Sequence, residues 1–144
     1  MTTYAPRHVD IWPWMNWKAS TFNATTRTNG SGYLGMGVLD LDANSTTGCY
    51  ISYEVALDAG TWTLTLIYQK NVDCGIVTPS LDATDLSTVD TYAASADDRV
   101  AQWTGITVGA AGVYTLKFRT DSKNASSSDY DLMLQLVTLT RTGA

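Results

Sequence analysis

The chain has 144 residues, which is the length of one ordinary domain and is enough to bury a core without a disulfide or a metal. Its formal charge is −5 and it has no cluster of Lys or Arg, which excludes nucleic acid as a partner because phosphate binding needs basic side chains on one face. No apolar run approaches the roughly 20 residues that span a bilayer, so the sequence predicts no membrane partner. The 22 threonines and the single glutamate favour strands over exposed helices.

The first 18 residues differ from the rest of the chain, because three tryptophans lie within six positions and Pro13 stands among them. Proline disfavours both a helix interior and a central strand. We therefore predict an extended N-terminal arm over residues 1–18 and one domain over residues 19–144. The arm either packs along its own domain or docks on a neighbouring subunit, since Trp is a strong interface anchor. The second interpretation assigns interface roles to Ile11, Trp12, Trp14 and Trp17.

After the arm, the sequence alternates between apolar strands and polar turns. Strands are expected over 21–27 and 33–41, with the turn 29–32 between them and a polar loop over 42–48. Residues 49–57 show strict alternation of apolar and polar side chains, which is typical of a strand with one buried face.

One motif occurs twice: AGTWTLTL over residues 59–66 and AGVYTLKF over residues 111–118. Each copy begins at a glycine suited to a turn, and Gly60 is expected to adopt a positive φ. Apolar residues then alternate with polar ones. We interpret the copies as equivalent corners, each of which leads a core strand into one of two facing sheets.

The remaining segments predict further strands. They are expected over 75–81, 88–92 and 102–108, with a loop over 93–101 and a long polar loop over 121–129. The last strand, 130–140, is apolar on both faces, with Leu132, Leu134 and Leu136 on one face and Val137 and Leu139 on the other. Such a strand should be central or covered by another chain. Roughly nine or ten short strands with frequent turns predict an all-β, antiparallel sandwich.

The sequence offers little for catalysis, and we predict no enzymatic activity and no cofactor. The only histidine, His8, lies in the arm, where no catalytic triad is expected. The acidic residues lie mostly in turns, where Asp is a common turn residue.

No metal ligand is assigned, although two acidic loops keep a calcium site open as an alternative to a solvated loop. Asp40-x-Asp42-x-Asn44 resembles the start of an EF-hand loop, but the Gly and Glu that such a loop requires are absent. The second loop contains Asp129 and Asp131. The two cysteines, Cys49 and Cys74, are expected to be buried thiols more readily than a disulfide.

The aromatic candidates for stacking on a sugar ring are Tyr92 and Trp103, which lie near a loop, and Trp12, Trp14 and Trp17 in the arm. For Trp103 we favour packing in the core, because its neighbours alternate as they do in a buried strand.

Several motifs resemble those of a known family: residues 59–64, 75–77, 81–84, 111–116 and 123–128. The chain from about residue 49 to 141 is similar to the galactose-binding-like jelly-roll sandwiches used as carbohydrate-binding modules. It resembles more closely the versions found in minor tail, tail-fibre and other virion proteins of bacteriophages. The resemblance implies a jelly-roll β-sandwich.

The resulting hypothesis is a non-enzymatic virion structural protein, either a capsid decoration or a minor tail protein. It would lie in the virion, assemble in the host cytoplasm, and contact other virion proteins and copies of itself. A homotrimer or a higher symmetric oligomer is expected, because a sheet edge and the apolar last strand need cover. The alternative hypothesis is a carbohydrate-binding module that recognises host surface glycans.

Overall fold

The computed structural model describes residues 8–28, 35 and 37–144. The predicted turn 29–32 and the start of the predicted strand 33–41 lie outside these residues. No α-helix occurs in the described part of the chain, which therefore contains no helix that could cross a membrane.

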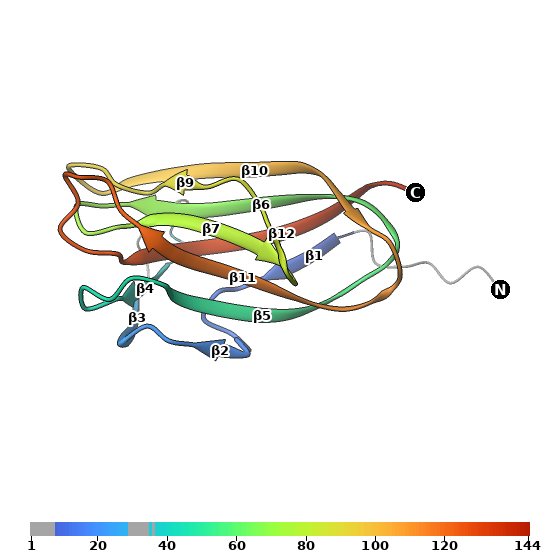
Figure 1. The fold of residues 1–144 in the computed structure, drawn as a ribbon, viewed down its shortest axis with the longest axis horizontal. Helices are drawn as coiled ribbons and strands as arrows, with labels where there is room; N and C mark the ends of the chain where they lie inside the picture. Colours follow the sequence, from blue (N-terminus) through green and yellow to red (C-terminus); the bar gives the residue numbers. More distant parts are fainter. Residues whose placement is uncertain (1–7, 29–34, 36) are drawn as a thin grey trace.

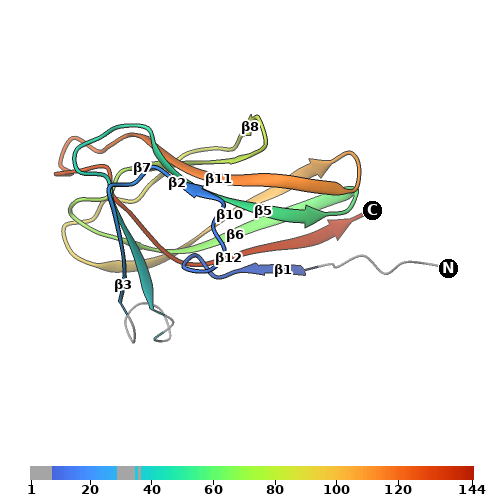
Figure 2. The ribbon, with the colours of Figure 1, turned by 90° about the horizontal axis from the view of Figure 1, so that it is seen from below.

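Two antiparallel sheets face each other, one above the other in Figure 2, which confirms the predicted all-β jelly-roll sandwich. The first sheet has the order β10 (Asp97–Val108), β6 (Gly60–Lys70), β12 (Leu132–Gly143), β4 (Val38–Asp42) and β3 (Ala24–Thr28), and β1 (His8–Ile11) also pairs with β12. The second sheet has the order β2 (Ala19–Ser20), β5 (Cys49–Leu57), β11 (Gly112–Ser122), β7 (Ile76–Leu81) and β8 (Thr84–Asp85), and β9 (Val89–Asp90) also pairs with β7.

The repeated motif forms corresponding strands of the two sheets, as predicted. The first copy becomes β6, between β10 and β12, and the second becomes β11, between β5 and β7. Gly60 has a φ of 146°, and a Cβ at this position would collide with the carbonyl oxygen of Gly143. The first copy therefore requires a glycine at its turn.

The core lies between the sheets and is built from the inward side chains of both motifs. Trp62 and Phe118 are fully buried, and Phe118 packs edge-to-face against Tyr53 with ring centroids 6.5 Å apart. The alternation predicted for residues 49–57 is confirmed, because Ile51, Tyr53 and Val55 are buried. Both cysteines are buried and free.

The last strand is central, as predicted, but the predicted division of its faces is wrong. A register shift lies between Leu134 and Leu136 where β12 pairs with β6. Leu132 and Leu134 face the core before this bulge, whereas Val137 and Leu139 face it afterwards. The extra residue of a bulge reverses the alternation, so Leu136 is only partly buried.

Strand β10 starts at Asp97, within the segment that we predicted as a loop over 93–101. Its first residues are polar, but they pair with the end of β6, Asp97 with Lys70 and Arg99 with Tyr68. The carboxylate of Asp98 also accepts hydrogen bonds from the side chains of Gln69, at 3.1 Å, and Gln135, at 2.6 Å. These long-range contacts hold a polar segment in the sheet.

The described part of the arm follows its own domain. Strand β1 pairs with β12, Ile11 opposite Val137, and β2 pairs with β5 in the other sheet. Residues 12–18 therefore cross from one sheet to the other, as the blue segment of Figure 2 shows. The described part of the arm thus packs along its own domain, which is one of the two interpretations of the sequence. Docking on a neighbouring subunit stays a prediction.

Candidate functional site

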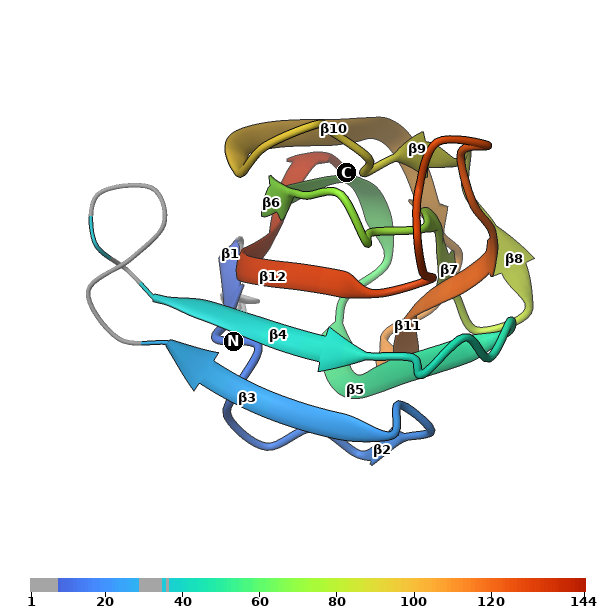
Figure 3. The same cartoon turned by 90° about the vertical axis from the view of Figure 1, so that its left-hand side faces the viewer.

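Four loops meet at one end of the sandwich, which faces the viewer in Figure 3. They are the segments 42–48, 71–75, 90–96 and 121–131, and we call this region the loop end. Backbone hydrogen bonds connect these loops, for example from the Ser128 amide to the Val72 carbonyl at 3.0 Å. The buried hydroxyl of Ser127 donates to the Cys74 carbonyl at 2.8 Å. Hydrogen bonds to backbone carbonyls, from backbone amides and from the Ser127 hydroxyl, therefore hold the loop end together.

Three carboxylates gather at the loop end: Asp42, Asp129 and Asp131 each place one oxygen within 4.8 Å of the others. The two acidic loops found in the sequence thus meet in space. The cause is the antiparallel pairing of β4 with β12, which places Leu41 opposite Leu132 and so brings the residues that follow and precede them together.

Backbone amides fix these carboxylates. Asp131 accepts from the Ala43 amide at 2.7 Å, and Asp129 accepts from the Ser45 amide at 2.8 Å. Asp42 accepts from the Asn44 amide at 2.7 Å. The backbone of the loop 42–48 therefore orients all three carboxylates.

The cluster has no counter-charge within the described chain, because none of the ion pairs there includes its members. Burial, with the neighbouring carboxylates of Asp129, Asp73 and Asp42, raises the pKa of Asp131 to about 7. Burial also raises the pKa of Asp40, with Asp73 and Asp42 adding to the effect.

The donor set suits a hard divalent cation. Calcium binds oxygen ligands at roughly 2.3–2.6 Å, so two of its ligands can lie up to about 5 Å apart, and the three carboxylates meet that condition. A cation would also supply the positive charge that the cluster lacks.

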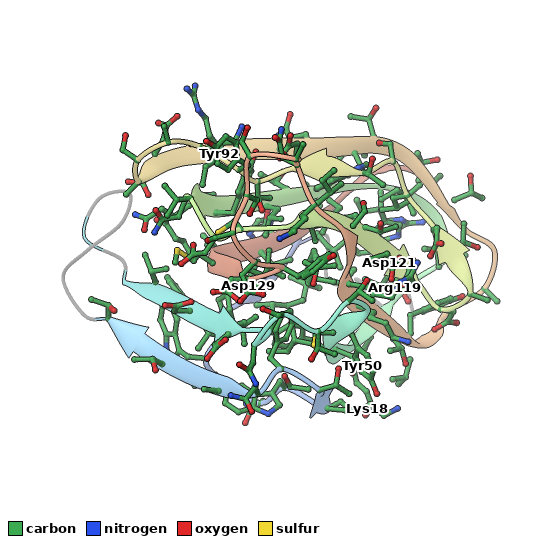
Figure 4. The ribbon with its side chains drawn as sticks, turned by 60° about the vertical axis from the view of Figure 1, so that its left-hand side comes forward. Lys18, Tyr50, Tyr92, Arg119, Asp121 and Asp129 are labelled. Carbon is green, nitrogen blue, oxygen red and sulfur yellow. The ribbon has the colours of Figure 1, made fainter. Side chains whose placement is uncertain are left out.

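Tyr92 lies at the loop end, as Figure 4 shows, and is partly exposed. The carboxylate of Asp90 accepts from the Tyr92 amide at 2.9 Å and from the Asn124 side chain at 2.7 Å. It thereby ties the segment 90–96 to the segment 121–131. The Tyr92 hydroxyl has no hydrogen-bond partner among the described residues, so it is available to a ligand.

Trp103, another aromatic candidate, is 7% exposed, and its ring nitrogen donates to the Ser87 carbonyl at 2.8 Å. Its ring packs in the core, as favoured from the sequence, and offers no open face to a sugar.

The four arm residues predicted as interface anchors divide into two classes. Ile11 is buried in the core and Trp14 packs against it, whereas Trp12 and Trp17 are 39% and 40% exposed. Beside Trp12 lies a groove of about 450 Å³, whose lining includes Met15, Asn16 and Glu54. We call it the arm groove.

The sequence contains no signal for most residues of this groove. Asp10, Met15 and Asn16 are unremarkable in the sequence, and Glu54 lies on the outer face of β5, far away along the chain. Only the crossing of residues 12–18 between the sheets brings them together.

Along the outer face of the second sheet, the cationic side chains already have partners. Lys117 lies 4.6 Å from the Tyr50 ring centroid, and Arg119 binds Asp85 at 3.1 Å and Asp121 at 2.6 Å. Figure 4 shows Tyr50, Arg119 and Asp121. His8 is exposed and contacts Asp10 and Thr140, with no nucleophilic cysteine beside it among the described residues.

No protein-family model matches the chain, and no curated protein matches it. Solved structures do match its fold. A xanthan lyase from Paenibacillus has a TM-score of 0.70 and 24% identity over 88% of this chain, which spans 12% of the lyase. The first family 36 carbohydrate-binding domain of a multidomain xylanase, from the hindgut metagenome of Trinervitermes trinervoides, has a TM-score of 0.66 and 16% identity, with 95% of this chain and 99% of that one covered.

A further family 36 carbohydrate-binding module, in complex with calcium and xylotriose, has a TM-score of 0.65 and 11% identity, and the match covers 92% of this chain and 99% of that one. At these identities the likeness establishes the fold. The jelly-roll sandwich of this chain is thus the fold of carbohydrate-binding modules.

Proposed function

We propose that this protein is a non-catalytic carbohydrate-binding module. The observation that carries the proposal is the extent of the structural match: almost the whole chain superposes on almost the whole of isolated carbohydrate-binding modules. Fold alone does not fix function, so the proposal also depends on the groups that the domain exposes.

The loop end offers groups suited to a sugar. Tyr92 is partly exposed, and its hydroxyl has no hydrogen-bond partner within the described part of the chain, which matches the apolar face and the hydroxyl rim of a pyranose. Its backbone amide is held by Asp90, so the segment that carries the ring needs little ordering on binding.

Calcium fits this function. Asp42, Asp129 and Asp131 would hold the ion, and because calcium takes six to eight oxygen ligands, positions would remain for water or sugar hydroxyls. The role of the chain is to present three oriented carboxylates at an exposed end.

A glycosidase is the competing interpretation of this cluster, since a carboxyl with a raised pKa can act as a general acid beside a second carboxylate. Two observations favour binding: one oxygen of each carboxylate is bonded to a backbone amide, and a third carboxylate oxygen lies within the same 4.8 Å.

A glycan array followed by calorimetry tests the proposal. We expect saturable binding of at least one polysaccharide without release of reducing sugar, and weaker binding by Tyr92→Ala than by Tyr50→Ala, which alters a tyrosine outside the loop end. No binding to any glycan, or turnover that Asp131→Asn abolishes, would contradict it.

The virion hypothesis stays a prediction, because none of the similar structures described above is a virion protein. The two hypotheses are compatible, since a virion can display a sugar-binding module. The position of the protein in an imaged particle would test the virion hypothesis.

A further inference from the structure

We infer that the arm groove is a second sugar site, which binds one or two units of a neutral pyranose oligosaccharide with Trp12 as its stacking platform. The inference rests on the proposed function for its ligand class but concerns a different surface from the loop end. Its volume of about 450 Å³ lies within the range of small-ligand pockets, roughly 300–1,000 Å³.

Trp12 is exposed and yet held in place. Its ring centroid lies 5.4 Å from that of Trp14, at an interplanar angle of 43°, and Trp14 packs against the core. On one side, Ile11 is fixed by the pairing of β1 with β12. Trp12 is therefore supported by a ring that cannot move away without disturbing the core.

The other side of the platform is also tethered. The Tyr53 hydroxyl donates to the Pro13 carbonyl at 2.7 Å, and the Lys18 amide donates to the Ser52 carbonyl at 2.7 Å. Asn16 has a φ of 53°, a conformation that Asn tolerates better than most residues. A ligand would thus meet a largely preformed surface, which lowers the entropy cost of binding.

The exposed apolar area suits a small ligand rather than a protein partner. A Trp side chain buries about 150–250 Å² when fully covered, so Trp12 and Trp17, each about two-fifths exposed, offer roughly 60–100 Å² apiece. Even when Met15, which is 52% exposed, and Trp17, which lies outside the groove, are both counted, the total stays below about 300 Å². A stable protein interface needs about 800 Å² from each partner.

The polar groups of the groove select for neutral sugars. Asp10 and Glu54 line it with carboxylates that accept hydrogen bonds from hydroxyls, and Asn16 adds a group that both donates and accepts. Each carboxylate already has a partner, His8 at 2.7 Å and Lys18 at 2.8 Å. Among the described residues, a sugar carboxylate would face two anions and no unpaired cation that lines the groove, so uronate sugars should bind more weakly.

The test compares two tryptophans of equal exposure, of which only Trp12 lines the groove. Calorimetry with cellotriose, xylotriose and galactobiose should find at least one ligand of the wild-type chain. Trp12→Ala should weaken its binding at least about tenfold, whereas Trp17→Ala should stay within about twofold. A galacturonate trimer should bind at least about tenfold more weakly than the neutral ligand.

Two measurements keep the test decisive if Trp12→Ala folds poorly. Asn16→Gly removes the carboxamide at a backbone conformation that glycine accepts, and it should weaken binding about threefold or more. Tryptophan emission of the wild-type chain should also change saturably with the neutral ligand.

The outcomes separate the two sites. Neutral-sugar binding that Tyr92→Ala abolishes and Trp12→Ala leaves unchanged would overturn the second site and keep the proposed function. A chain that binds none of the three neutral probes would overturn the arm-groove site, and a blank glycan array would overturn the module itself. Self-association that Trp12→Ala abolishes would instead identify the groove as an interface between copies.

Discussion

Replacing Tyr53 by Phe tests how the arm is fastened to the domain. The Tyr53 side chain is 2% exposed, and its hydroxyl donates to the Pro13 carbonyl at 2.7 Å. Burial raises the pKa of this hydroxyl, so it keeps its proton at any pH at which the protein would be studied. Phe retains the ring and its edge-to-face contact with Phe118, so the substitution removes one hydrogen bond and leaves a buried acceptor.

A net hydrogen bond contributes about 0.5–1.5 kcal/mol, and an unsatisfied buried group costs about 1–3 kcal/mol. We therefore expect Tyr53→Phe to lower the free energy of unfolding by about 1–2 kcal/mol, and the Tm by roughly 3–6 °C. Urea denaturation followed by tryptophan fluorescence measures the loss. The same variant should weaken binding in the arm groove, because the Trp12 platform loses a tether.

The matched control is Tyr114→Phe. Its hydroxyl also donates to a backbone carbonyl, that of Ala110 at 2.6 Å, but at the surface, where water can replace it. We expect a loss below about 0.5 kcal/mol. Equal stability of Tyr53→Phe and the wild type would show that the tether contributes nothing and would refute the argument that the platform is preformed.

Three further predictions concern other parts of the domain. Gly60→Ala should lower the free energy of unfolding, measured by chemical denaturation, by about 2–4 kcal/mol, because φ is positive there and a Cβ would collide with the Gly143 carbonyl. Gly109→Ala should be neutral, because the space around its Cβ is open. Cys49 and Cys74 should resist a thiol reagent until the chain unfolds, since burial raises the pKa of both thiols; rapid labelling of the native protein would contradict this. In EDTA, the free energy of unfolding should fall by up to about 4 kcal/mol as the pH rises from about 4 to about 7. In this range the raised pKa of Asp131 lets the native state keep a proton that the unfolded state has lost. Asp131→Asn should remove most of that slope and leave the part due to Asp40, whose pKa is also raised; calcium should suppress the Asp131 part, and a slope unchanged in the variant would refute the assignment.

The sequence predicts the strands that carry a clear alternation. The strand over residues 49–57 and the two copies of the repeated motif are found where expected, because each has one face in the core and one in solvent. Residues 130–140 lack that contrast. Without a polar face there is no sign in the sequence of the bulge beside Gln135, and the predicted faces change places after it.

The loop-end cluster shows where local reading of the sequence stops. Both acidic loops stand out in the sequence, but their meeting depends on the pairing of β4 with β12. That pairing joins segments about 90 residues apart along the chain, and nothing within either segment encodes it. The same limit applies to the arm groove, which needs Glu54 to lie beside Asn16.

The difference between Trp12 and Trp14 bears on why the arm contains both. Trp14 packs against the core, as Ile11 does within it, so these two residues account for how the arm is fixed to the domain. Trp12 contacts the Trp14 ring and leaves 39% of its surface in water. A lone exposed apolar residue needs no explanation, but Trp12 stands on a supporting ring, beside a groove, with hydrogen-bonding groups around it. A ligand that stacks on Trp12, as we propose, would account for the part of its ring that the sandwich leaves exposed.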